Sequence, residues 1–186
     1  IGIPLEIMQI PEMPTMEVYE NVMQETLEKL KNKGITHSVF GDIFLEDLRQ
    51  YREDKLATMG FEGVFPIWKI STKDLIQEFI SLGFKTIIVC VNEKHLDKSF
   101  VGRIIDQQFI DDLPVDVDVC GENGEFHTFC FDGPIFNKSI DFEIGEIVYR
   151  KYEKPKQESS NTACDTDDTT AYDYGFWYCD LLPKND

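Results

Sequence analysis

A glycine-rich segment holds the residues whose types are best suited to chemistry. Residues 115–136 read VDVDVCGENGEFHTFCFDGPIF and combine carboxylates, an imidazole and a hydroxyl in Glu122, Glu125, His127 and Thr128. Gly121 and Gly124 can adopt backbone conformations that other residues avoid, so a ligand could approach the main chain closely. Beyond them, strand-like alternation predicts that Glu125 and His127 point to the same side. Such a pair suits acid/base work or cation binding, although two carboxylates in a glycine-rich turn are also compatible with simple solvation.

An arginine interrupts the apolar face of a second segment. Residues 45–59 predict a helix with an apolar stripe of Leu45, Leu48, Leu56 and Met59, and Arg52 falls inside that stripe. A guanidinium turned inward is costly unless it meets a carboxylate or a phosphate. Arg52 is therefore either a functional residue or half of a buried ion pair, for which the candidate partners are Glu53, Asp42 and Glu122.

Gly41 and Asp42 occupy the junction between a predicted strand, residues 37–40, and that helix. In parallel α/β sheets, ligands bind at the carboxyl ends of strands and next to helix N-termini. The position therefore favours contact with a nucleotide or with Mg²⁺. Taken alone, Asp42 would equally suit a helix cap.

The remaining elements alternate between helices and strands. Helical spacing covers residues 16–33, 71–82 and 100–113, and strand patterns cover residues 1–10, 85–92, 144–152 and 175–182. The continuous β-branched run at 85–92 indicates a central strand covered on both faces. The order predicts an α/β fold, with a parallel-sheet nucleotide-binding domain in residues 1–98 and a smaller α+β substrate-binding domain in residues 99–186. The acidic segment 154–174 offers few apolar anchors and predicts a mobile loop.

Composition excludes several classes of protein. The sequence has 35 acidic and 18 basic residues and a formal net charge of −17, which argues against general nucleic-acid binding. A small anion such as ATP remains compatible, because local amides, arginines and Mg²⁺ can dominate the global charge. Five cysteines without a CxxC pair indicate reduced thiols in a cytoplasm, and neither a membrane span nor a signal peptide is predicted.

CGENGEFHTF followed by DGPIF resembles the signature of the diphthine–ammonia ligase family, part of the PP-loop superfamily of ATP pyrophosphatases. The resemblance continues in the family's order over most of residues 1–136, through Gly41-Asp42-Ile43 with Arg52-Glu53, Phe65-Pro66-Ile67-Trp68 and Val101-Gly102-Arg103. The family's Ser-Gly-Gly-x-Asp-Ser phosphate loop occurs nowhere in this sequence. The sequence also starts without Met, so the PP-loop domain is expected to be incomplete at its N-terminus and this chain alone to be inactive.

The resemblance implies an ATP-dependent ligase that activates a carboxylate as an acyl-adenylate, from which ammonia displaces AMP to give an amide. It assigns ATP and Mg²⁺ to Gly41, Asp42, Arg52, Arg103, Gly121 and Gly124, with Asp42 on the metal, and the acceptor side to Glu122, Glu125, His127 and Thr128. The acidic residues and the imidazole are expected to line one cleft that opens toward Gly41 and Asp42, where a carboxylate pKa would be raised or the imidazolium stabilised.

Asn123 and His127 stand where the eukaryotic and archaeal enzymes more often have Gly and Glu. This resembles a bacterial branch that acts on another carboxylate, such as a corrinoid precursor. The partners would be a small-molecule or protein carboxylate and ammonia, and a homodimer is compatible. The alternative is a non-catalytic protein or fragment that binds ATP or a metal ion; a metal-dependent hydrolase is a weaker alternative, because no HExxH motif is present.

Overall fold

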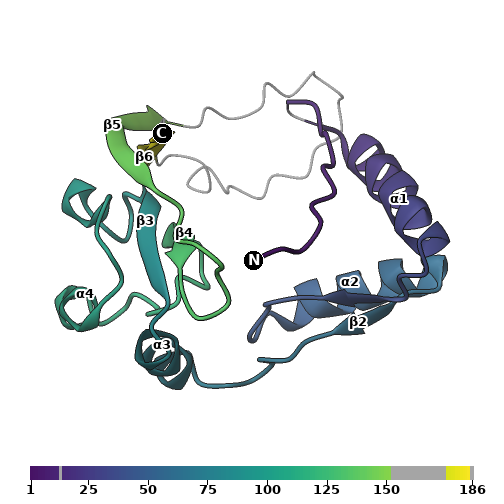
Figure 1. The fold of residues 1–186 in the computed structure, drawn as a ribbon, viewed down its shortest axis with the longest axis horizontal. Coiled ribbons are helices and arrows are strands. Elements are labelled where there is room, and N and C mark those ends of the chain that lie inside the picture. The colour runs from purple at the N-terminus through teal and green to yellow at the C-terminus, as the bar shows by residue number, and fades with distance from the viewer. Residues whose placement is uncertain (13, 152–174, 185–186) are drawn as a thin grey trace, which may run out of the picture. The chain divides into compact units, whose positions relative to one another are not determined.

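Two groups of elements make up the chain, and each has its own small core. The structure is a computed structural model that describes residues 1–12, 14–151 and 175–184. Its contacts divide the chain into an N-terminal unit, Gly2–Ser71, and a C-terminal unit, Thr72–Asp186 together with Ile1 (Figure 1). The predicted loop at residues 154–174 lies outside the described residues.

The N-terminal unit is built on two helices and two short strands: α1 Met16–Asn32, β1 His37–Val39, α2 Glu46–Met59 and β2 Glu62–Val64. β1 and β2 pair in parallel, with His37 opposite Glu62. The apolar faces of the helices meet in a cluster around Leu27, Leu56 and Phe61. Of the predicted stripe of α2, Leu56 and Met59 therefore belong to this core, whereas Leu45 lies before the helix and is 37% exposed.

Local signals set the ends of both helices. Thr15 caps α1, because its hydroxyl accepts a hydrogen bond from the Val18 amide at 3.3 Å. Gly60 ends α2 in the left-handed conformation with φ of 72°, which a residue with a side chain would adopt only at a cost. Leu45, and not Asp42, precedes the first turn of α2, and it makes no side-chain cap. Asp42 is thus available for another role.

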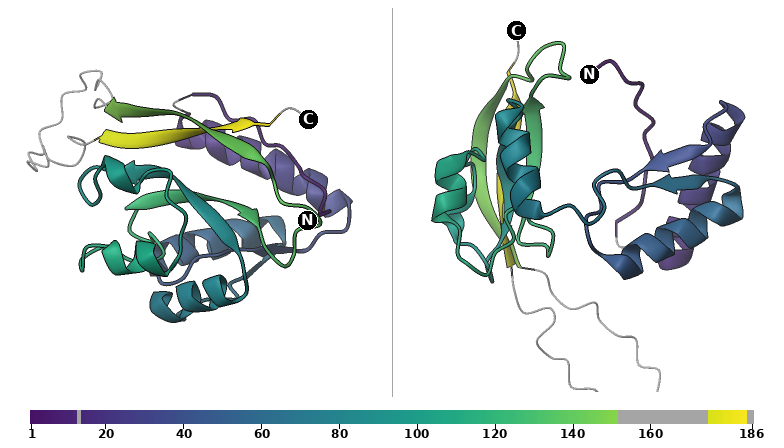
Figure 2. Two further views of the ribbon diagram at one scale, coloured as in Figure 1. Left: turned by 60° about the vertical axis from the view of Figure 1, so that its left-hand side comes forward. Right: turned by 90° about the horizontal axis from the view of Figure 1, so that it is seen from below.

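The C-terminal unit contains a four-stranded antiparallel sheet in the order β4-β3-β6-β5. Its elements are α3 Thr72–Ser81, β3 Lys85–Asn92, the 3-10 helix η1 Lys98–Phe100, α4 Gln107–Asp112, β4 Phe126–Asp132, β5 Phe142–Lys151 and β6 Gly175–Pro183. The long strands β5 and β6 lie side by side (Figure 2).

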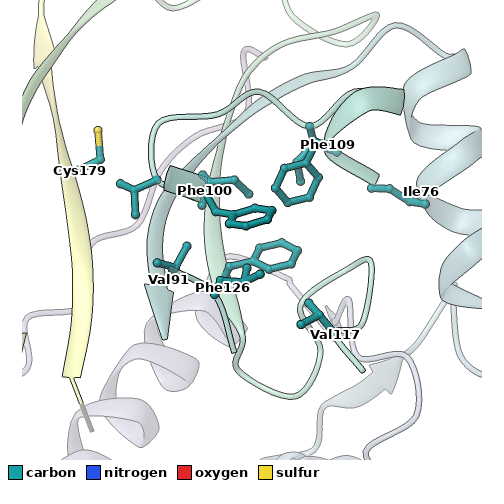
Figure 3. Close-up of a cluster of buried hydrophobic side chains, with 11 residues drawn as sticks. Ile76, Val91, Phe100, Phe109, Val117, Phe126 and Cys179 are labelled. Atoms are coloured by element: carbon teal, nitrogen blue, oxygen red, sulfur yellow. The ribbon is translucent and has the colours of Figure 1, made fainter. Parts of the chain in front are cut away.

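The core of the C-terminal unit lies between this sheet and its helices. Ile76 from α3 and Phe109 from α4 belong to the same cluster as Val91 of β3 and Phe126 of β4 (Figure 3). Phe109 stands edge-on to Phe126, with ring centroids 5.7 Å apart. Both helices therefore cover the same face of the sheet.

The expected parallel sheet is present only in β1 and β2. β3 occupies a central place and is buried along most of its length, as its apolar run predicted, but it pairs antiparallel with both of its neighbours. A continuous apolar run reports burial on two faces and carries no information about strand direction. The mixed α/β class is confirmed, whereas the prediction of β3 as part of a parallel sheet is wrong.

Two other predicted elements differ in the structure. Residues 1–10 form no strand, and Ile3 and Leu5 are 75% and 85% exposed. The helix predicted at 100–113 shortens to α4, because Gly102 adopts φ of 80° and the following residues run along β3, where the Ile88 amide donates to the Arg103 carbonyl at 2.9 Å. Apolar spacing alone could not reveal this pairing.

The division between Ser71 and Thr72 falls earlier than the predicted domain boundary at 98/99. The reason is β3, whose two partners, β4 and β6, both lie in the C-terminal unit. The assignment of nucleotide binding to residues 1–98 stays a proposal. Among the described residues, no helix combines the length and apolar character needed to cross a membrane.

Candidate functional site

The signature loop, residues 118–125, is folded around the carboxylate of Glu125. Glu125 is 1% exposed, and its oxygens accept hydrogen bonds from the Asp118 amide at 3.0 Å, the Asn123 amide at 2.8 Å and the Asn123 side-chain Nδ2 at 3.0 Å. A buried carboxylate needs such donors, because an unpaired charge away from water is very costly. Glu125 therefore holds the two ends of the loop together.

A second carboxylate organises the same loop from its start. Asp118 Oδ1 accepts from the Cys120 amide at 2.9 Å and from the Glu122 amide at 3.4 Å. Its Oδ2 accepts from the Thr72 hydroxyl at 2.7 Å, which links the loop to the first residue of α3. Sequence analysis did not identify Asp118 or Thr72, although an Asp two residues before the loop's first amide donor is a familiar turn signal.

The backbone amides of the loop are engaged internally. Besides the amides held by Asp118 and Glu125, the Gly121 amide donates to the Asp118 carbonyl and the Gly124 amide to the Gly121 carbonyl. Gly121 and Gly124 have φ of 73° and 81°, so the unusual backbone predicted for both glycines is confirmed. Phosphate-binding loops present free amides to the anion. The amides of this loop are instead bonded within it, and Glu122 is its half-buried carboxylate.

The pKa of Glu125 is lowered from its ordinary value of 4.5. Burial pushes the pKa upward, but the hydrogen bonds from Asp118 and Asn123 to the charged form outweigh that effect. The expectation of a raised carboxylate pKa is therefore wrong for Glu125. An ionised, fully bonded carboxylate of this kind stabilises the loop and is poorly suited to accept a proton.

His127 and Thr128 lie next to the loop, at the start of β4. His127 is opposite Cys90 and Thr128 is opposite Ile88 in β3, and both side chains are exposed. Glu125 precedes the strand and turns into the loop, so the predicted alternation that would put it beside His127 does not hold. Glu122 is half-buried in the loop. Glu122 and His127, and not Glu125, remain the accessible acid/base candidates.

Cys120 lies inside the loop, and its thiol is expected to be a poor nucleophile. Its thiol donates to the Thr72 carbonyl at 3.4 Å. Burial, together with the negative charges of Asp118 and Glu122, raises its pKa to about 12. Only the thiolate reacts readily with electrophiles.

We expect Cys120 to resist alkylation at pH 8 in the native protein. The difference between its raised pKa and the ordinary value of 9.0 corresponds to a thiolate fraction about 1000-fold smaller. Iodoacetamide labelling followed by peptide mass spectrometry, with the urea-unfolded protein as control, measures this. Equal labelling rates in the two samples would contradict the proposed burial of the thiol.

In the N-terminal unit, Arg52 meets Asp42, as the interrupted apolar stripe predicted. Arg52 Nε lies 2.8 Å from Asp42 Oδ2, and the side chains are 32% and 13% exposed. Both atoms are buried, and their alignment is not that of a hydrogen bond, so the contact is an ion pair. The Arg52 guanidinium also covers the Phe40 ring at 4.5 Å. The Arg52 side chain is 32% exposed, so the pair is not closed to solvent.

A neighbouring arginine on α2, Arg49, is held by contacts within the N-terminal unit. Arg49 pairs with Glu53 at 2.9 Å and covers the rings of Phe65 and Trp68 at 4.6 and 4.7 Å. These contacts stabilise α2 against the loop after β2 through cation–π attraction. Trp68 is thus part of the packing around α2.

Arg103, the other candidate cation, contacts residues of the C-terminal unit. It pairs with Asp112 at 2.7 Å and lies over the rings of Phe100 and Phe109. The hydrogen bond from Arg103 lowers the pKa of Asp112. These contacts account for Arg103 without a ligand, and its assignment to ATP stays a prediction.

Asp42 is the candidate ligand for Mg²⁺. Within residues 1–12, 14–151 and 175–184, no group of three or more His, Cys, Asp or Glu side chains is arranged to hold a metal ion. Mg²⁺ at nucleotide sites is commonly bound by one or two carboxylates together with phosphates and waters. Asp42 is a single carboxylate paired with Arg52, and its assignment to Mg²⁺ stays a prediction. Asp42 and the signature loop lie in different units, so the predicted common cleft stays a prediction.

Comparison with known proteins identifies the C-terminal unit. Residues 71–157 match the model of the diphthamide synthase C-terminal domain. The chain is 30% identical to the diphthine–ammonia ligase of Bos taurus over 132 residues, which cover 68% of this chain and 49% of that enzyme. The chain belongs to the diphthine–ammonia ligase family.

Other diphthine–ammonia ligases show the same extent of similarity. The enzyme of Homo sapiens is 29% identical over 132 residues and that of Mus musculus 30% over 135 residues, each covering 68% of this chain and 49% of the enzyme. The chain spans about half the length of the curated relatives it matches. The matched C-terminal domain begins at Ser71, next to the division between the two units, and contains the whole signature loop.

Proposed function

We propose that the protein carrying this sequence is an ATP-dependent ligase that converts a substrate carboxylate into an amide with ammonia. The observation that carries the proposal is its kinship with diphthine–ammonia ligases, since the matched domain contains the signature loop. The internal bonding of the loop supports it, because amides already bonded to Glu125 and Asp118 are not free to bind a phosphate. ATP, when bound, would supply the activation of the carboxylate.

In this proposal the two units divide the work. Asp42 and Arg52, which pair at 2.8 Å, would serve Mg²⁺ and the phosphates of ATP, as the family resemblance of their motifs implies. Glu122 and His127 bind ammonia as ammonium and accept its protons, because both belong to or adjoin the loop and Glu125 is fully engaged. Thr128 follows His127 in β4, where successive side chains point to opposite faces, so its place on the acceptor side rests on the family resemblance alone.

The acceptor is either diphthine or another carboxylate. Asn123 donates two hydrogen bonds to Glu125, from its amide and from its side chain, so a glycine at this position would lack the second one. The more closely fixed loop, together with His127 in place of Glu, favours a bacterial branch with its own carboxylate substrate.

The decisive experiment measures AMP and pyrophosphate release by the full-length protein from MgATP and ammonium chloride. Diphthine-containing peptide and a panel of other carboxylates are supplied in parallel. Carboxylate-dependent AMP release with amide formation is the expected result. MgATP binding without AMP release for any carboxylate would overturn the proposal and favour a non-catalytic binding protein.

Arg52→Lys is expected to weaken MgATP binding about 10-fold, because a lysine cannot reproduce the planar, multiply bonding guanidinium. Isothermal titration calorimetry measures the affinity. Arg49→Lys is the matched control, since Arg49 lies on the same helix and makes an ion pair and ring contacts of the same kind. Equal effects of both substitutions would show that α2 packing, and not nucleotide contact, is being altered.

A further inference from the structure

We propose that Asp118 and Thr72 are positioning residues that present the Glu122 carboxylate to ammonia. The inference rests on the proposed function and deepens it: it names the residues that set the geometry of the acceptor side. Neither residue belongs to the group that the sequence assigned to chemistry.

The contacts of Asp118 reach Glu122 directly. Asp118 Oδ1 accepts from the Glu122 amide, so the carboxylate fixes the backbone from which the Glu122 side chain extends. The same oxygen accepts a hydrogen bond from the Cys120 amide, two residues before Glu122, which fixes the loop backbone at a second point. The backbone of Glu122 is therefore held by a residue outside the CGENGE motif itself.

Thr72 ties this arrangement to a rigid element. Its hydroxyl donates to Asp118 Oδ2 at 2.7 Å, and its carbonyl accepts from the Cys120 thiol at 3.4 Å. Thr72 is the first residue of α3, and α3 packs into the core through Ile76. Two bonds from one residue of a docked helix restrict both the translation and the rotation of the loop.

Asp118 and Glu125 have separate tasks in the loop. Glu125 joins residues 118 and 123 and so closes the loop upon itself. Asp118 joins the loop to α3 through Thr72. Loss of the Thr72 hydroxyl removes the 2.7 Å bond to Asp118 and is expected to loosen the loop from α3 while its internal fold persists, which makes Thr72 a better probe of positioning than either carboxylate.

The test compares Thr72→Val, which keeps the shape and removes the hydroxyl, with Thr72→Ser, which keeps the hydroxyl. Both are made in the full-length protein. Kinetics with ammonium chloride and MgATP give separate KM values, and iodoacetamide labelling of Cys120 reports on loop attachment. Thermal unfolding confirms that both variants fold.

Thr72→Val is expected to lower kcat/KM for ammonium about 10-fold or more, because small misplacements of a reacting group are costly. Its KM for ATP should stay unchanged and its Cys120 should be labelled faster, whereas Thr72→Ser should behave as the parent in all three measurements. Identical ammonium kinetics in Thr72→Val and Thr72→Ser would overturn the inference, as would an equal change in both KM values. If the parent protein forms no amide, the proposed function fails and the inference fails with it, whatever the labelling rates.

Discussion

Replacing Glu125 with alanine is expected to lower the free energy of unfolding of the C-terminal unit by about 3–4 kcal/mol. The substitution leaves three donors, from Asp118 and Asn123, without their acceptor in a site where Glu125 is only 1% exposed. Urea unfolding measures the loss. Glu143→Ala, at an exposed position of β5, is the control and should change the free energy of unfolding by less than about 0.5 kcal/mol.

The pH dependence of stability distinguishes the charge of Glu125 from its shape. Because its pKa in the folded protein lies below the ordinary value of 4.5, the ionised carboxylate contributes stability that is complete above about pH 4.5. That contribution decreases as the pH falls below 4.5 and is lost once the pH falls through the lower, folded pKa. Glu125→Gln should therefore differ most from the parent near neutral pH and converge with it in acid. A constant difference at all pH values would contradict this role.

Glu122→Gln is expected to reduce amide formation about 100-fold or more while leaving MgATP affinity unchanged. Glu122 is half-buried in the loop, whereas Glu125 is committed to structure by burial and three hydrogen bonds. Glutamine keeps the size of Glu122 while removing its charge. His127→Ala should have an effect of similar size. Quenched-flow measurement of amide and AMP separates the ammonia-dependent step from activation of the carboxylate.

The control for Glu122→Gln is Glu143→Gln, which removes one negative charge from an exposed position of the same unit. It should leave turnover unaltered. Full turnover in both Glu122→Gln and His127→Ala would assign the signature loop to a structural role. Loss of MgATP binding by Glu122→Gln in a folded protein would instead place the loop at the nucleotide.

The sequence predicted those parts of the candidate site whose signal is local. Gly121 and Gly124 marked a backbone in the left-handed region, and both adopt it. Arg52 stood out because it broke an apolar stripe, and it meets Asp42, one of the partners named for it. In both cases the residues that give the signal are close to one another in the sequence.

The features that sequence reasoning missed depend on pairing between distant segments. The burial of Glu125 follows from amide donors that the folded loop directs at it, and an alternating strand pattern could not show that Glu125 stands before the strand. The direction of β3 depends on β4 and β6, which follow much later in the chain. Periodicity reports which faces are buried but not which partner covers them.

The bond between Thr72 and Asp118 has a consequence for how the protein folds. It joins residues 46 apart in sequence, and the thiol contact of Cys120 with the Thr72 carbonyl spans 48. Closing so long a segment costs chain entropy that only the packing of α3, β3 and α4 can offset. We therefore expect the signature loop to reach its final shape late in folding, after these elements have packed.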